Sequence, residues 1–219
     1  MKQLLLILLT CLTASAFGQS ITCDPNMDFE NGNTANWSFY HGLFYGTGST
    51  SLPGDINSPE TVASSSGYLT LTSGSTTDAY GHFPIVSPDG GSYSLKIGND
   101  VINYNSDKGE FWVHVPAGVD DYSLIYRYAI VMEDPGHTAD LQPRFNVNTY
   151  DSATGNQIPC GNFSYVAGSL PGFSVSNVGS QVYYKPWATA AINLSGYAGT
   201  RINLNRTCIL RACYRWLTR

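Results

Sequence analysis

The sequence predicts an all-β domain, a sandwich or barrel of short strands. Segments that alternate between apolar and polar residues are separated by clusters of glycine, proline and asparagine, and none shows the helical period of 3.6 residues. Charged residues make up only 12% of the 219 residues, about half of the roughly 25% usual in soluble domains. The composition therefore argues against a helical bundle or a coiled coil.

The first 18 residues have the form of a signal peptide. Lys2 precedes an apolar run, Leu4 to Leu12, that is too short to span a bilayer. Ala16 and Gly18 then supply the small residues of a cleavage site before Gln19. No other segment has the length of a transmembrane helix. We therefore expect an exported protein that is secreted or held at the cell surface.

The expected strands follow one another along the mature chain. They cover residues 68–72, 93–97, 111–115, 122–133, 144–150, 162–166, 172–175, 181–184 and 188–194. The longest, 122–133, is apolar on both faces, which predicts a central strand covered on both sides. Its Arg127 then needs an acidic partner, which we expect on a neighbouring strand. The Ser/Thr/Gly/Pro-rich stretch 47–66 is either a functional loop or a mobile surface excursion.

Four cysteines remain after removal of the leader: Cys23, Cys160, Cys208 and Cys213. In an oxidising compartment they could form two disulfides, with three alternative pairings. None belongs to a CxxC pair, and no histidine follows Cys208 and Cys213 at zinc-finger spacing. A zinc site is therefore not expected.

The sequence contains no recognised catalytic motif. HExxH, GxSxG, P-loop and GxGxxG patterns are all absent. A glycosidase needs two carboxylates facing each other across a cleft, and nothing selects a pair among Glu30, Glu60, Glu110 and Glu133. Residues 19–200 hold 16 acidic and five basic side chains, which disfavours nucleic acid as a partner. We therefore expect a protein that is not an enzyme.

Two groups of residues are candidates for binding. Glu133 and Asp134, followed by Pro135, Gly136 and His137, form either a calcium-binding loop or an acidic turn, and the acidic turn is the favoured interpretation. Flat side chains suited to stacking on sugar rings are Trp37, Trp112, Trp187 and Tyr184. Aromatic residues also dominate protein cores, so each of these four has a structural alternative.

Two short segments resemble parts of known modules. Asp28-Phe29-Glu30-Asn31-Gly32, followed by Trp37, is similar to the opening strand of carbohydrate-binding-module jelly rolls. Gly91 to Gly98 (GSYSLKIG) resembles a strand common to those modules and to MAM-like domains. The resemblance implies a jelly-roll β-sandwich, in which Asp28 or Glu30 would help to hold a structural calcium ion.

A longer set of motifs resembles a second family. The matching segments are 126–129, 133–137, 142–145, 159–160, 184–187 and 194–199. They are similar to the N-terminal module of exported Bacteroidetes surface proteins with PKD-type repeats and a gliding-motility-associated C-terminal sorting domain. This resemblance covers residues 22–200 and implies a non-catalytic module for adhesion or glycan binding, whose partner is a surface glycan or protein. The alternatives are a fragment of a secreted polysaccharide-degrading enzyme and a structural spacer.

The C-terminal residues differ from the rest of the chain. Every acidic residue lies between Asp24 and Asp151, whereas five of the 11 basic residues fall within 201–219. The segment also departs from the family pattern after Gly199. We therefore expect a jelly-roll module over residues 19–200 and an atypical Arg-rich tail over 201–219. The hypothesis is a truncated product with an out-of-frame tail, and a sandwich that lacks its closing strand would expose an unpaired edge.

Overall fold

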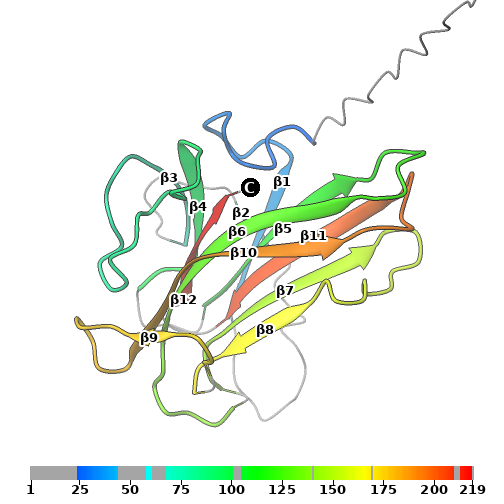
Figure 1. Ribbon diagram of the computed structural model, residues 1–219. Helices are drawn as coiled ribbons and strands as arrows, with labels where there is room; N and C mark the ends of the chain where they lie inside the picture. Colours follow the sequence, from blue (N-terminus) through cyan, green and yellow to red (C-terminus); the bar gives the residue numbers. More distant parts are fainter. Residues whose placement is uncertain are drawn as a thin grey trace, which may run out of the picture.

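The protein is an all-β sandwich of two six-stranded sheets in the computed structural model (Figure 1). The structure describes residues 24–43, 58–60, 68–100, 105–139, 141–168, 170–209 and 213–218. The expected signal peptide, Cys23 and most of the stretch 47–66 lie outside these ranges. Strand pairs in both sheets are antiparallel, so the predicted jelly-roll β-sandwich is confirmed.

The first sheet is called the β11 sheet here, after one of its two middle strands. In spatial order it contains β2 (Ser58–Glu60), β1 (Trp37–Leu43), β5 (Asn105–His114), β11 (Arg201–Ile209), β7 (Arg144–Asp151) and β8 (Phe163–Val166).

The second sheet is called the β6 sheet. In spatial order it contains β3 (Leu69–Ser73), β4 (Tyr93–Ile97), β12 (Cys213–Thr218), β6 (Ser123–Glu133), β10 (Val182–Asn193) and β9 (Ser174–Val175).

The last two strands of the chain occupy the middle of the two sheets. β11 pairs with β5 on one side and β7 on the other, and β12 lies between β4 and β6. Figure 1 shows β11, coloured orange-red, running between β5 and β7. The expectation of a missing closing strand is therefore wrong, because β12 fills that position within the sheet.

The main core lies between the facing sides of the two sheets. Alternation along each strand sends every second side chain inward. Phe111 and Val113 of β5, Leu204 of β11 and Val147 of β7 are almost fully buried there, together with Ile130 of β6. This core is formed by residues from both halves of the chain.

A second, smaller cluster covers part of the outer side of the β6 sheet. Ala129 and Val131 of β6 point away from the main core and are buried against Phe83, which belongs to the β3–β4 connection. β6 is therefore central and covered on both sides, as the sequence predicts. β6 pairs with β10 on both sides of a register irregularity between Lys185 and Ala188. The two strands predicted at 181–184 and 188–194 are therefore one strand in the structure.

Two further expectations on local structure need correction. Residues 28–32 form turns rather than an opening strand, and Phe29 adopts a positive φ of 66° that is incompatible with extended backbone. The first strand begins only at Trp37. Arg127 does have the expected acidic partner, but it is Asp89 from the β3–β4 connection rather than a residue of a neighbouring strand.

Candidate functional site

The outer side of the β11 sheet combines aromatic and amide side chains. On β5, β11 and β7, the residues that alternate with the buried core positions point to this side, because successive side chains of a strand face opposite ways. The outward positions include Glu110 and Trp112 on β5, Asn203 and Asn205 on β11, and Asn148 and Tyr150 on β7.

The strand register arranges these residues in two parallel rows. Asn203 lies opposite Trp112 on one side and opposite Tyr150 on the other. The adjacent row contains Asn205 and its partner in register Asn148, with Glu110 at the β5 end. We call the set Trp112, Tyr150, Asn203, Asn205 and Asn148 the amide–aromatic face.

Burial and hydrogen bonding make the centre of this face unusual. Trp112 is 38% exposed, whereas Asn203 beside it is only 7% exposed. The side-chain oxygens Oδ1 of Asn203 and Asn205 are buried and have no hydrogen-bond partner among the described residues. A buried acceptor without a donor is unfavourable by about 1–3 kcal/mol, so both oxygens would gain from a donor supplied by water or by a ligand.

Polar contacts fix the margins of the face. Gln157 donates from Nε2 to the hydroxyl of Tyr150 at 3.3 Å and to Oδ1 of Asn148 at 3.5 Å. At the β5 end, Lys108 forms an ion pair of 2.7 Å with Glu110. These contacts hold the rim side chains in place and neutralise the carboxylate of Glu110.

A second cation lies at the margin beside Trp112. The guanidinium carbon of Arg201 is 5.6 Å from the centre of the Trp112 ring, a cation–π geometry that places a positive charge next to the exposed indole. The five members of the amide–aromatic face are themselves uncharged. The arrangement is therefore suited to binding a polar, hydroxyl-bearing molecule with an apolar flat side.

Of the aromatic candidates named from the sequence, Trp112 alone belongs to this face. Trp37 is buried in the main core, stacked on Phe29 with ring centres 4.6 Å apart, and its indole N–H donates to the carbonyl of Asn26. A residue held in this way has no ring face open to a ligand. Trp37 is therefore not a candidate for binding a ligand.

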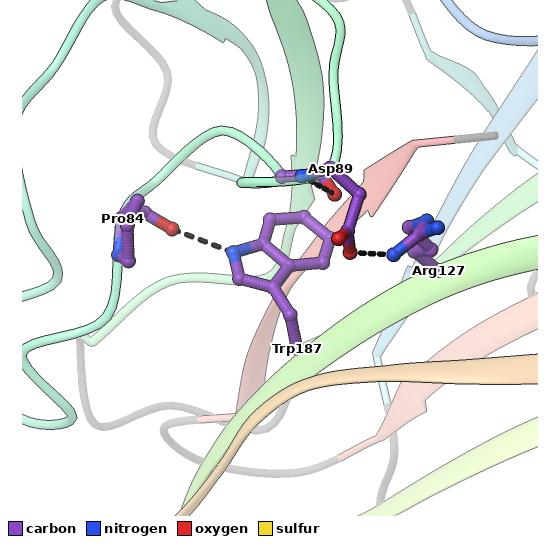
Figure 2. A network of polar contacts seen from close by, with 5 residues as sticks. Pro84, Asp89, Arg127 and Trp187 are labelled. Atoms are coloured by element: carbon purple, nitrogen blue, oxygen red, sulfur yellow. Dashed lines mark hydrogen bonds and ion pairs between the residues drawn. The ribbon is translucent and has the colours of Figure 1, made fainter.

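Trp187 and Tyr184 lie on the outer side of the other sheet. Both pack on the cluster around Phe83, and Trp187 donates its indole N–H to the carbonyl oxygen of Pro84 at 2.7 Å (Figure 2). Beside the indole, Asp89 forms its ion pair with Arg127. These contacts attach the β3–β4 connection to the sheet, so a structural role accounts for both aromatic residues.

The acidic residues of the first predicted calcium site make contacts with the backbone. The carboxylate of Glu30 accepts hydrogen bonds from the N–H groups of Ser92 and Tyr93, at 2.8–3.2 Å, and Asp28 accepts from the N–H of Glu30. Glu30 thus connects the N-terminal turns to the start of β4. Both of its oxygens are engaged in these contacts.

The second predicted calcium site is a turn. Asp134 accepts hydrogen bonds from the N–H of Gly136 and from the side chain of Gln142, while Glu133 ends β6. Among the described residues, no three acidic, histidine or cysteine side chains gather closely enough to hold a metal ion. Calcium binding at either site stays a prediction.

The cysteines do not behave alike. Cys208, in the buried part of β11, is disulfide-bonded, whereas Cys160 carries a free and exposed thiol. Cys160 lies in a turn before β8 with a positive φ of 58°. It is therefore not part of a disulfide, so the four cysteines do not form the two disulfides that the sequence allows.

Reasoning from the sequence missed Asn203, Asn205, Asn148 and Tyr150 as candidates. The signal was present, because Ile202-Asn203-Leu204-Asn205 and Phe145 to Tyr150 both alternate apolar and polar residues. In β7 the strand was recognised but its outward asparagines were not considered. Residues 201–209 were interpreted as a tail because of their arginines, although they alternate between apolar and polar residues as a strand does.

No helix in the described part of the chain is long and apolar enough to cross a membrane. No protein-family model and no curated protein matches the sequence.

Several solved structures resemble the chain at low identity. TmCBM61 in complex with β-1,4-galactotriose is 14% identical over 91% of this chain and 95% of its own, with a TM-score of 0.43. CBM27-1 of Caldicellulosiruptor saccharolyticus in complex with mannohexaose is 13% identical over 87% and 91%, with a TM-score of 0.37. The K2 cleaved adhesin domain of Lys-gingipain is 14% identical over 87% and 92%, with a TM-score of 0.38. At these identities the likeness concerns the fold alone.

Proposed function

We propose that this chain is a non-catalytic glycan-binding module of an exported cell-surface protein, and that it binds through the amide–aromatic face. The observation that carries the proposal is the register of Trp112 with Asn203, whose buried side-chain oxygen has no partner among the described residues. The face thus offers a flat exposed ring directly beside a group that needs a hydrogen-bond donor.

A sugar ring matches both properties. One side of a pyranose is lined by C–H groups and can pack on an indole, while its edge carries hydroxyls that donate to amide oxygens. Trp112 supplies the apolar contact, and Asn203 and Asn205 supply acceptors. The export signal expected at residues 1–18 supports a setting in which glycans are available.

The same face gives little support to the alternative of a polysaccharide-degrading fragment. Hydrolysis of a glycosidic bond ordinarily needs two carboxylates on opposite sides of the bond, roughly 5–10 Å apart. Glu110 is the one acidic residue among the outward positions of three described segments: 108–114 of β5, 201–207 of β11 and 146–150 of β7. Its carboxylate forms an ion pair with Lys108. The arrangement therefore favours binding over hydrolysis.

The proposal is tested by affinity electrophoresis in gels containing soluble galactan, mannan, xylan or mixed-linked β-glucan, with and without added calcium. We expect at least one polysaccharide to retard the wild type. Trp112→Ala and Asn203→Ala should weaken that interaction roughly tenfold or more, as expected when a central anchor of an interface is lost.

The matched control is Ile125→Ala, which truncates a side chain that is 51% exposed on the outer side of the β6 sheet. This variant should be retarded like the wild type. Absence of retardation by every polysaccharide, or equal retardation of Trp112→Ala and the wild type, would overturn the proposal. Circular dichroism of each variant establishes that it is folded.

A further inference from the structure

The two aromatic residues of the amide–aromatic face lie in a row that crosses the strands. Trp112 and Tyr150 lie in the same row on opposite sides of Asn203. They are separated by two interstrand spacings, which amounts to about 10 Å. This row runs across the strands, and its length exceeds a single sugar ring.

The amide row runs parallel to the aromatic row. Asn205 and Asn148 are partners in register, two residues along their strands from Asn203 and Tyr150. The rows are therefore roughly 7 Å apart. A ligand lying over the aromatic row would direct one edge toward these amides. The oxygens of Asn203 and Asn205 are buried and unpartnered, so they accept hydroxyl protons along that edge when their side chains rotate toward the ligand.

A ligand running along a strand would meet different surroundings. Along β5, the outward neighbours of Trp112 are His114 on one side and, on the other, Glu110, which is engaged in an ion pair with Lys108. Along β11, the outward positions 201, 203, 205 and 207 include no aromatic residue. The direction across the strands brings Trp112, Tyr150 and the unpartnered amides under one ligand without passing over the Lys108–Glu110 ion pair.

The two rows of the amide–aromatic face contain no charged side chain, and the cation of Arg201 lies at their margin beside Trp112. Trp112, Asn203, Tyr150, Asn205 and Asn148 are uncharged, and the two unpartnered groups are hydrogen-bond acceptors. A carboxylate or sulfate over these two oxygens would lose hydration and gain no donor from them. A neutral hydroxyl-bearing ligand meets no such penalty.

Building on the proposed function, we infer that the ligand is an uncharged oligosaccharide of at least two rings that lies across β5, β11 and β7. One ring packs on Trp112, a following ring reaches Tyr150, and the hydroxyl edge donates to Asn203 and Asn205. Tyr150 is then a specificity-determining residue for chain length, held by the hydrogen bond from Gln157.

The first test is a length series measured by isothermal titration calorimetry. The ligands are the mono-, di-, tri- and tetrasaccharides of the neutral polysaccharide that gives the strongest retardation in the gel panel. We expect affinity to rise at least tenfold from the monosaccharide to the trisaccharide. Equal affinity across the series would overturn the inference.

The second test uses variants at the far end of the row. Tyr150→Ala should weaken trisaccharide binding severalfold and leave monosaccharide binding unchanged, whereas Trp112→Ala should weaken both. Tyr183→Ala, on β10 of the other sheet, serves as the matched aromatic control and should bind like the wild type. Unchanged trisaccharide affinity in a folded Tyr150→Ala variant would contradict the placement.

The third test compares charge. Polygalacturonate and alginate should bind at least tenfold more weakly than the neutral polysaccharide, at low and at high salt. Stronger binding to either would overturn the inference of an uncharged ligand while leaving glycan binding itself intact. Failure of every polysaccharide to bind would instead overturn the proposed function, so the two failures are distinguishable.

Discussion

The guanidinium carbon of Arg206 lies 4.6 Å from the centre of the Tyr126 ring, inside the main core. Arg206 is an inward residue of β11 and only 3% exposed, and its Nε has no hydrogen-bond partner among the described residues. Burial lowers the pKa of this guanidinium to about 10, and the interaction with Tyr126 opposes that shift. A cation has thus been placed where an apolar side chain would ordinarily lie.

We expect Arg206→Met to stabilise the fold. A buried ion can often be replaced by an apolar residue of similar size with a neutral or favourable effect of about 1–4 kcal/mol, and here the loss of the contacts with Tyr126 and Trp37 reduces the gain. The free energy of unfolding, from urea denaturation at neutral pH, should therefore rise by about 1–2 kcal/mol. A decrease of similar size would show that the aromatic contacts outweigh desolvation.

The same residue predicts a dependence on alkaline pH. A base with a lowered pKa in the folded state destabilises the fold at pH values below that pKa, and the penalty disappears as pH rises from about 10 toward the higher pKa of the unfolded chain. The stability advantage of Arg206→Met over the wild type should thus shrink by roughly 1 kcal/mol between about pH 8 and pH 10.5. An advantage that stays constant would contradict the lowered pKa.

Glu30 should be important for attaching the N-terminal turns. Its carboxylate accepts from two backbone N–H groups at the start of β4, and charge-assisted bonds of this kind are stronger than neutral ones. Because the side chain is exposed, we expect Glu30→Ala to lower the free energy of unfolding by only roughly 0.5–1.5 kcal/mol.

The control for Glu30 is Ser92→Ala, which keeps the backbone donor and should leave stability unchanged. Both variants and the wild type are compared by thermal unfolding with calcium and with EDTA. If Glu30 acts through the backbone alone, its effect is the same in both conditions. An effect of Glu30→Ala that appears only with calcium would assign the residue to an ion instead.

Trp187 should contribute more than the neighbouring ion pair to holding the β3–β4 connection. Trp187→Phe keeps an aromatic ring but removes the donor to Pro84, which is expected to lower stability by about 1 kcal/mol. Asp89→Asn breaks a solvent-accessible pair with Arg127, and such pairs contribute about 0–1 kcal/mol. Urea denaturation should rank the first loss above the second.

Hydrogen exchange tests whether the Trp187→Phe substitution loosens the β3–β4 connection. The amide of Ile85, which donates to the carbonyl of Thr76, should exchange faster in Trp187→Phe. Glycan binding should stay unchanged, because Trp187 belongs to the sheet opposite the amide–aromatic face. Weakened glycan binding in this variant would place the ligand on the β6 sheet.

The sequence predicted those strands whose own residues show a clear apolar and polar pattern. The alternation of Tyr93 to Ile97 and the doubly apolar run from Ser123 to Glu133 both depend on local pattern, and both strands appear as expected. β1 was missed because Trp37 follows a series of turns, in which Asn26, Phe29 and Asn36 adopt positive φ values. Local propensity gives no indication of where such a series ends.

The candidate site could not be predicted because its residues become neighbours only through the pairing of strands that are distant in sequence. Trp112 and Asn203 are far apart in sequence, and only the pairing of β5 with β11 brings them together. Trp37 and Trp112 are equivalent as residue types, yet one faces the core and the other the surface. Composition also misdirected the interpretation of Arg201 to Ile209, where Ile202 and Leu204 carry the core pattern between arginines.

The last prediction concerns the C-terminal residues. Composition places a boundary near Gly199, and a module ending there would unfold cooperatively without the tail. In the structure β11 separates β5 from β7, and its removal would leave one edge of each of these two strands unpaired in the middle of the sheet.

A chain ending at Thr200 should therefore be insoluble or lack a cooperative thermal transition, whereas the full chain unfolds in one step. A second chain ending at Ile209 keeps β11 but loses β12 between β4 and β6, and it should fold with a lower midpoint. A chain ending at Thr200 that retains the wild-type midpoint would show that the module is complete without the tail. It would also exclude Asn203 and Asn205 from any function of that module.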